Sequence, residues 1–316
     1  MDLFKRMVID LGTVNSIYSV LGSSEFFCEP SVVAVSVPEG KIIAVGEQAK
    51  KMLGRTPANI KAQKPLKDGV IANYKVTETM LRHFINNALG KLRLIKPELV
   101  IAVPVGLSSI ERAAVKDAAT SAGARRVILF PKPLAAAIGA GVPIGEPSGS
   151  MIINIGGGTT EAAVISLGAI VASKTFKVGG NKLDEAIVAF VKNHHGLHIG
   201  EQTAEQAKIL LKDELEIKGR SAKTKAPATA VLKREEIYKA VKPVFEELAR
   251  AVGEVLEKIP PELSSDVLDK GAVLSGGSAL FKGLDLYLSD YLNLPIHKAD
   301  NPLYCVARGL KKNPPL

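Results

Sequence analysis

The chain has 316 residues, with 41 lysines and arginines against 32 aspartates and glutamates, so its formal net charge is +9. This length suits about two domains, and a hydrophobic fraction of 47% with 23% charged residues excludes a disordered or collagen-like chain. No run of about 18 apolar residues is present, which excludes a membrane-spanning segment of ordinary length.

The two cysteines, Cys28 and Cys305, stand far apart in the sequence, which favours a reducing compartment. The first residues pass directly into a strand-like run and show no hydrophobic leader. A cytosolic protein is therefore expected. The positive charge leaves open nucleic acid, an anionic membrane surface or no particular partner.

In chain order, strand and helix signals alternate, which predicts an α/β protein. Ser108 and Glu111 have the spacing of a capping box, in which a serine oxygen and a glutamate satisfy the first helical N–H groups. The helix that it starts should end near Ala122, before Gly123. The other expected elements are strands Met7–Asp10, Ser16–Leu21, Leu99–Val103 and Arg126–Phe130 and a helix over Thr77–Lys91.

Two similar segments, Val8–Thr13 and Ile152–Gly157, lie 144 positions apart. Each begins with an apolar strand, reaches Asp10 or Asn154, turns through glycine and meets hydroxyl side chains before a second apolar strand. A match this short can arise by chance, but the shared order of chemistry favours a duplicated domain.

The stretch Glu214–Val231 has the pattern of an exposed hairpin with a basic tip at Arg220, Lys223 and Lys225. A plain solvated loop is the alternative.

Three glycine-rich segments predict a nucleotide site when they are taken together: Gly12-Thr13, Gly156–Thr160 and Ala272–Ser278, the last followed by a helical run from about Leu280. Glycine lets backbone N–H groups approach phosphate oxygens closely, and threonine adds a hydroxyl donor. Each segment alone is equally consistent with a structural turn. Neither a P-loop nor a Rossmann glycine motif occurs.

These segments resemble the actin, Hsp70 and sugar-kinase superfamily, and within it the bacterial actins of the MreB family. The matching segments cover nearly the whole chain: Asp10–Asn15, Glu29–Val32, Gly46–Lys51, Gly54 with Thr56–Ala58, Asp68–Ala72, Met80–Arg82, Ala135–Gly139, Glu146–Gly149, Gly156–Glu161, Asp184–Val188 and Pro260–Leu263. The hairpin region at 214–232 is shorter than is usual in that family.

The resemblance implies a duplicated ribonuclease-H-like fold with two domains, each carrying a smaller subdomain, and ATP with Mg²⁺ in the central cleft. Domain I would comprise residues 1–144 and 297–316, with its small subdomain at about 30–69. Domain II would comprise residues 145–296, with its small subdomain at about 182–240.

The resemblance also implies roles for particular residues. Asp10 would face the metal, and Glu205 and Lys208, three residues apart on a helix, would contact ribose and adenine; the alternative for this pair is an ordinary surface ion pair. The implied cofactor-binding residues are Asp10, Gly12, Thr13, Asn15, Gly156, Gly157, Gly158, Thr159, Thr160, Glu205, Lys208, Gly276 and Gly277.

Two departures fall where this family hydrolyses ATP. Asn154 stands where the family has an aspartate that helps to organise Mg²⁺, and Lys132 stands where it has a glutamate that positions the attacking water. A charged lysine cannot accept a proton, although it can pair with a γ-phosphate. We therefore expect weak or absent hydrolysis, unless another residue such as Asp68 substitutes. Together the two changes add three positive charges relative to the family pattern, two for glutamate to lysine and one for aspartate to asparagine.

The resemblance further implies filaments of this chain on the inner face of the cytoplasmic membrane, with the cell-wall elongation machinery as a partner. Leu94 and Ile95 resemble the apolar loop that touches the bilayer, and Leu3 and Phe4 are a second candidate wedge; the alternatives are burial within the protein for Leu94 and Ile95 and the start of a strand for Leu3 and Phe4. Nucleic acid is not expected, because there is no tryptophan and aromatic residues make up 5%.

His194, His195 and His198 invite a metal site, but Gly196 interrupts the helical spacing and a polar surface segment is favoured. Among functions, a membrane-associated actin-like filament protein that scaffolds cell shape or wall synthesis is preferred. An active ATPase or sugar kinase of the same superfamily is the alternative.

Overall fold

A five-stranded mixed sheet organises the first half of the chain in the computed structural model, which describes residues 5–37, 39–91 and 95–313. Its strand order is β10-β9-β1-β2-β3, with β1, β2 and β3 antiparallel and β9 and β10 parallel to β1. The strands are β1 (Arg6–Asp10), β2 (Asn15–Val20), β3 (Phe27–Pro30), β9 (Glu98–Val103) and β10 (Arg126–Pro131). All six residues of β9 are buried, as expected for a central strand that is covered on both faces.

The second half repeats this sheet, with the order β13-β12-β11-β17-β18. Its strands are β11 (Ser150–Ile155), β12 (Thr160–Ser166), β13 (Ala169–Phe176), β17 (Ala272–Ser275) and β18 (Ile296–Lys298). The first three are antiparallel and the last two run parallel to β11. The same topology occurs twice, so the duplication inferred from the repeated segment is confirmed.

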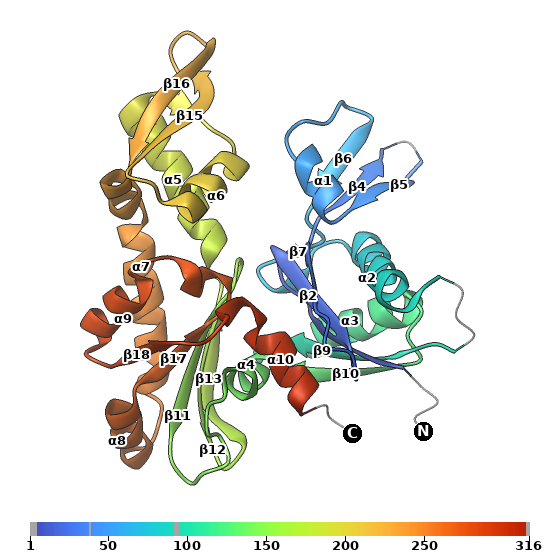
Figure 1. The fold of residues 1–316 in the computed structure, drawn as a ribbon, viewed down its shortest axis with the longest axis vertical. Helices are drawn as coiled ribbons and strands as arrows, with labels where there is room; N and C mark the ends of the chain where they lie inside the picture. Colours follow the sequence, from blue (N-terminus) through green and yellow to red (C-terminus); the bar gives the residue numbers. More distant parts are fainter. Residues whose placement is uncertain (1–4, 38, 92–94, 314–316) are drawn as a thin grey trace.

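Helices cover both sheets and link their strands (Figure 1). They are α1 (Glu47–Met52), α2 (Tyr74–Leu89), α3 (Ser109–Ser121), α4 (Lys132–Ala140), α5 (Gly180–His195), α6 (Glu201–Leu210), α7 (Arg234–Leu256), α8 (Pro261–Lys270), α9 (Leu284–Leu292) and α10 (Cys305–Lys312), with 3-10 turns η1 (Gly277–Leu280) and η2 (Pro302–Tyr304). The capping box at Ser108 and Glu111 is confirmed, with both reciprocal hydrogen bonds formed.

Each half carries a small sheet at the far end of the molecule (Figure 1). In the first half it has the order β5-β4-β6, and in the second half β14-β15-β16. The strands are β4 (Val33–Ser36), β5 (Ile42–Val45), β6 (Ile60–Gln63), β14 (Leu197–His198), β15 (Glu214–Ser221) and β16 (Pro227–Lys233), and a separate pair is β7 (Leu66–Lys67) with β8 (Val70–Ile71).

The two lobes are joined by α4 and α10, which cross between the large sheets (Figure 1). Their contact depends on Gly139 and Gly309: a Cβ atom at Gly139 would overlap the carbonyl group of Cys305, and one at Gly309 would overlap that of Ala135. The helices therefore approach backbone to backbone. A buried cluster that includes residues of both sheets surrounds the crossing: Val8, Val100, Ala102, Ala135, Ala136, Ala137, Ile152, Ala163, Ile165, Val306 and Leu310.

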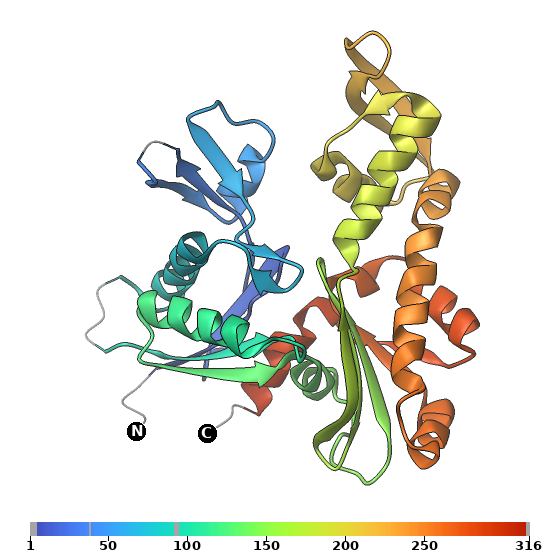
Figure 2. The ribbon, with the colours of Figure 1, turned by 180° about the vertical axis from the view of Figure 1, so that it is seen from behind.

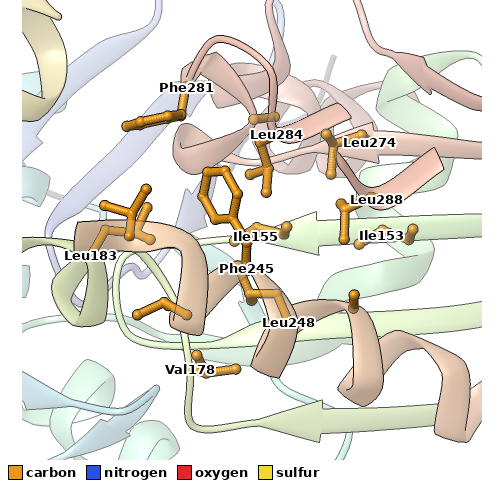
Figure 3. Packing of buried hydrophobic residues seen from close by; sticks show 14 of the residues in the cluster. Ile153, Ile155, Val178, Leu183, Phe245, Leu248, Leu274, Phe281, Leu284 and Leu288 are labelled. Carbon is orange, nitrogen blue, oxygen red and sulfur yellow. The ribbon is translucent and has the colours of Figure 1, made fainter. Parts of the chain in front are cut away.

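The largest core belongs to the second lobe, where α5, α7 and α9 pack against its sheet. Phe245 lies at its centre between strand residues such as Ile155 and the helical Leu284 (Figure 3). Phe245 and Phe281 meet edge to face with ring centroids 5.4 Å apart, an arrangement that aromatic pairs prefer. This packing fixes the backbone from which the second half of the site extends.

Two details of the expected elements were wrong. No α-helix starts near Leu280: Gly277–Leu280 forms a 3-10 turn, and α9 begins at Leu284. The reason is that Gly283, directly before α9, adopts the left-handed conformation with φ 83°, which interrupts a right-handed helix; the turn itself is anchored at its start, where the Gly276 N–H donates to the Pro302 carbonyl. Arg220 lies within β15, opposite Pro227, so the tip of the predicted hairpin carries Lys223 and Lys225 alone.

The expected domain limit at 296/297 falls inside β18, and the division into domains stays a prediction.

Candidate functional site

The tips of two equivalent hairpins meet between the lobes. We call residues 10–15, at the β1–β2 turn, the first hairpin, and residues 154–160, at the β11–β12 turn, the second hairpin. A Cβ atom at Gly158 would lie 2.7 Å from Oγ1 of Thr13, and one at Gly157 would overlap the side chain of Val14. Glycine in the second hairpin is thus required by the close approach of the first.

A cavity of about 390 Å³ lies between these tips. It is lined by the first hairpin, by the second hairpin, by α5 and α6, and by the turn at Gly276–Ser278. That turn is held against the second hairpin, because the Ser278 hydroxyl donates to the Gly156 carbonyl at 2.9 Å. A volume of this size suits a small organic ligand.

At the inner end of the cavity, Lys132 is paired with Asp10. Lys132 is the first residue of α4, and its Nζ lies 3.0 Å from Asp10 Oδ1 and 3.4 Å from the Leu11 carbonyl oxygen. Burial alone would lower the pKa of Lys132, but the carboxylates of Asp10 and Glu161 raise it above its usual value. The side chain therefore stays an ammonium ion, even though Lys132 is buried and only 7% of its surface is exposed.

Glu161 is a buried acid next to this pair. It stands opposite Asn154 in the β11–β12 ladder and is 1% exposed. Within the described residues, neither of its carboxylate oxygens has a hydrogen-bond partner of normal geometry. Burial raises the pKa of Glu161 to about 7, against the opposing effect of the Lys132 ammonium. Near neutral pH this carboxyl is therefore poised between its two forms.

Asn154 also has a hydrogen-bond partner within the protein, since its Oδ1 accepts a hydrogen bond from the Ser275 hydroxyl at 3.1 Å. Mg²⁺ prefers free carboxylate, phosphate and water oxygens. Asp10, the residue expected to face the metal, is instead paired with an ammonium ion. In the part of the chain that the structure describes, no three His, Cys, Asp or Glu side chains form a group that could hold a metal ion. At this end of the cavity the described side chains therefore offer a divalent cation no unpaired carboxylate.

Lys208 and Glu205 both line the cavity from α6, but each pairs with a different partner. Lys208 Nζ lies 2.8 Å from Asp184 Oδ1 on α5 and donates to the Gly180 carbonyl at 3.0 Å. Burial raises the pKa of Asp184 to about 6, and the Lys208 ammonium opposes this rise. The surface pair between Lys208 and Glu205, considered from their spacing, is not formed.

Glu205 joins the two lobes across the mouth of the cavity. Its Oε1 and Oε2 lie 2.9 and 2.8 Å from Nζ of Lys50, which is on α1 in the small subdomain of the first lobe. One turn away, the Gln202 amide donates to the Lys50 carbonyl at 2.6 Å. We call these contacts the α1–α6 clasp.

Most of the residues expected to bind the cofactor line one cavity. They are Asp10, Gly12, Thr13, Asn15, Gly156, Gly157, Gly158, Thr159, Glu205, Lys208, Gly276 and Gly277, and the two expected catalytic positions Lys132 and Asn154 line the same cavity. Thr160 and Asp68 are outside this lining. Thr160 is fully buried and its hydroxyl donates to the Val178 carbonyl at 2.8 Å, so this hydroxyl hydrogen bonds to the backbone and not to a ligand. Asp68 lies in the β7–β8 turn, and only its neighbour Gly69 reaches the cavity.

The other candidate residues lie away from this cavity. His195 Nε2 is 3.0 Å from Glu236 Oε1, while His194 stacks on Phe190 with centroids 3.9 Å apart. Ile95 is 43% exposed, and Leu3, Phe4 and Leu94 lie outside the described residues. None of the helices over residues 5–37, 39–91 and 95–313 has the length and hydropathy to cross a membrane.

Sequence reasoning missed the partners that define this site. Glu161 had a visible signal, because it is the one charged residue of a strand that is otherwise small or apolar, Thr160–Ser166. Lys50, 155 positions from Glu205, carries no local signal that connects it with the cavity.

The duplicated sheets, the paired hairpins and the cavity between the lobes define an actin-like protein. The solved structures of MreB5 of Spiroplasma citri bound to ADP and to AMPPNP match with a TM-score of 0.93 and 34% identity, over 99% of this chain and 96% of theirs. The MamK double helical filament has a TM-score of 0.81 at 21% identity, over 97% of this chain and 98% of that one, which shows the shared fold.

A family model described as MreB/Mbl protein matches residues 4–314. Cell shape-determining protein Mbl of Bacillus subtilis (strain 168) is 45% identical over 316 residues, 97% of this chain and 95% of that protein. Cell shape-determining protein MreB of Escherichia coli (strain K12) is 44% identical over 314 residues, 95% of this chain and 90% of that protein. The chain belongs to the MreB/Mbl family.

Proposed function

We propose that this protein is an ATP-binding actin-like filament protein that acts at the inner face of the cytoplasmic membrane and scaffolds cell shape or wall synthesis. The cavity between the two hairpins carries the proposal, because it brings glycine backbones, threonine hydroxyls and three lysines to one place. The ADP and AMPPNP named for MreB5 and the filament named for MamK support a nucleotide and self-association.

Filament formation is tested by electron microscopy and sedimentation of the purified protein with and without AMPPNP. Nucleotide-dependent filaments are expected. A protein that stays monomeric at all concentrations, with or without nucleotide, would contradict the scaffold.

We propose further that hydrolysis of ATP is weak or absent. Lys132 is held as an ammonium ion against Asp10 and cannot accept a proton from a water molecule. Asn154 is neutral and its amide oxygen is used by Ser275. Neither position therefore provides the free carboxylate that would orient or activate water.

A double change, Lys132→Glu with Asn154→Asp, should raise the rate of phosphate release, because both substitutions supply a carboxylate at the inner end of the cavity. An increase of about 10- to 100-fold is expected for a positioned general base. Phosphate release from ATP is measured with filaments of both proteins at equal polymer mass. Rapid release by the unaltered protein, lost in a cavity variant such as Lys208→Ala, would contradict the proposal.

Membrane association is proposed from the exposed Ile95 and from the net charge of +9. One buried isoleucine contributes about 1.5–3 kcal/mol at best, so a single subunit binds weakly and a filament binds through many such contacts. Ile95→Ser should reduce pelleting with vesicles of anionic lipid several-fold under filament-forming conditions. The matched control is Ile110→Ser, an equally apolar side chain that is 80% exposed on α3; an equal loss in both variants would exclude a specific role of the loop.

The alternative, an active sugar kinase of the same superfamily, is disfavoured by the ammonium of Lys132. A kinase needs a base that accepts the proton of the sugar hydroxyl, and within the described lining each carboxylate, Asp10, Asp184 or Glu205, is paired with a lysine. Transfer of phosphate from ATP to a sugar would support this alternative.

A further inference from the structure

We propose that this cleft binds its nucleotide without Mg²⁺, and that the Lys132 ammonium neutralises the polyphosphate in place of the metal ion. The inference rests on the nucleotide binding proposed above and specifies how that same site holds the phosphates.

The first support is the charge at the inner end of the cavity. The carboxylate there, Asp10, is matched by Lys132 at 3.0 Å, and Asn154, at the equivalent position of the second hairpin, is neutral. The other carboxylates of the described lining, Asp184 and Glu205, are also paired with lysines. The described lining therefore repels a polyphosphate less than an unpaired Asp10 would, and it offers a metal ion no unpaired carboxylate.

The second support is the geometry of Lys132. An ammonium group carries three N–H donors, and Lys132 has two acceptors among the described residues, Asp10 Oδ1 and the Leu11 carbonyl. A third donor remains for a phosphate oxygen. Because the side chain is buried and starts a helix, it is held at the point where the two hairpins converge.

The third support is the cost of adding the metal ion. Mg²⁺ bound directly to Asp10 would sit about 2 Å from the carboxylate oxygen, on the same group that Lys132 approaches to 3.0 Å. Two cations would then share one carboxylate that keeps only 14% of its side-chain surface exposed, where water screens their repulsion less than in bulk solvent. Mg²⁺ and the Lys132 ammonium are thus competitors for Asp10.

The test is titration calorimetry with AMPPNP in Mg²⁺ and, separately, in EDTA. The affinity of the unaltered protein should change by less than about threefold between the two conditions, because an ammonium ion already supplies the local positive charge. Lys132→Glu should lose at least tenfold in EDTA and recover in Mg²⁺. Lys132→Gln, which removes the charge and is nearly as long, should also lose affinity in EDTA and recover it in Mg²⁺. It replaces the glutamate variant in the test if that variant does not fold. Lys51→Gln, on the exposed face of α1, is the matched control and should behave like the unaltered protein.

A second readout counts the metal directly. Protein is loaded with AMPPNP and Mn²⁺, passed rapidly through a desalting column, and analysed for nucleotide and manganese. Nucleotide with substoichiometric Mn²⁺ is expected for the unaltered protein, and equimolar Mn²⁺ for Lys132→Glu. A tenfold loss of affinity of the unaltered protein in EDTA, or equimolar Mn²⁺, would overturn the inference while leaving nucleotide binding intact. Absence of AMPPNP binding in both buffers would instead overturn the proposed function.

Discussion

The first and second hairpins share the same backbone topology but differ in the side chains at their tips. Each joins two antiparallel strands at the same position of its sheet. The first presents Thr13 and Val14 at its tip, whereas the second presents Gly157 and Gly158 to them. Two equal tips cannot both carry side chains at this distance, so the close contact requires that one of them be small.

The strands behind the tips differ in the same way. Asp10 in β1 stands opposite the apolar Ile17, while Asn154 in β11 stands opposite Glu161. The acid of the first hairpin, Asp10, is thus on the first strand, whereas the acid beside the second hairpin, Glu161, is on the second strand. Lys132 lies near both acids. Duplication has preserved the topology while the buried charges have moved between equivalent positions.

The largest expected effect comes from removing the buried charge at Glu161, in the strand β12 that follows the second hairpin. Glu161→Gln should raise the free energy of unfolding at pH 8 by as much as about 3 kcal/mol. The folded-state pKa of Glu161, about 7, lies above its ordinary 4.5, so the stability of the unaltered protein falls as pH rises from 4.5 to 7 and stays low above that. The gain should therefore be small at pH 5 and full at pH 8 in urea unfolding.

Glu247→Gln, at an exposed position of α7, is the control for this change and should show no such dependence on pH. A loss of stability in Glu161→Gln at pH 8 would mean that Lys132 stabilises the ionised form more than burial destabilises it.

A smaller effect is expected when the contact between the tips is broken. Gly157→Ala places a methyl group against Val14, and such overpacking costs about 1–3 kcal/mol. We expect a lower melting temperature and weaker AMPPNP binding, both partly restored by adding Val14→Ala. Gly145→Ala, where the methyl group meets no atom within 4 Å, is the matched control. Equal behaviour of the two alanine variants would show that the tips are free to separate.

The smallest effect concerns the α1–α6 clasp, where the lobes meet again. Lys50 and Glu205 keep 28% and 20% of their side-chain surface exposed, so a double-mutant cycle of Lys50→Gln and Glu205→Gln should give a coupling energy of about 0.5–1 kcal/mol. The coupling is measured by urea unfolding without nucleotide and should shrink in high salt. The exposed helical pair Lys182 and Glu185 provides a reference cycle, and a clasp coupling no larger than zero would show that this ion pair does not help to hold the lobes together.

Local signals predicted much of the fold, since a capping box, an apolar strand and a glycine turn are each complete within a few residues. The equivalence of Asp10 and Asn154 was also visible, because it lies in a repeated segment. The 3-10 turn at Gly277 was not, since a carbonyl at Pro302 holds it. The pairing of Lys132 with Asp10 spans 122 positions, and its geometry follows from three-dimensional packing rather than from either segment.

The glycine contact between α4 and α10 sets how the lobes can move. Helices that touch backbone to backbone interlock and resist sliding, whereas they can still tilt about the point of contact. In Figure 1 the crossing of α4 and α10 lies between the two large sheets, and α1 and α6, which carry the clasp, lie in the upper half of the molecule; Figure 2 shows the same arrangement from behind. A tilt about Gly139 and Gly309 would therefore change the separation of Lys50 and Glu205 more than it changes the contact between the two helices. A ligand that contacts both hairpins would resist such a tilt, because it would join one lobe to the other.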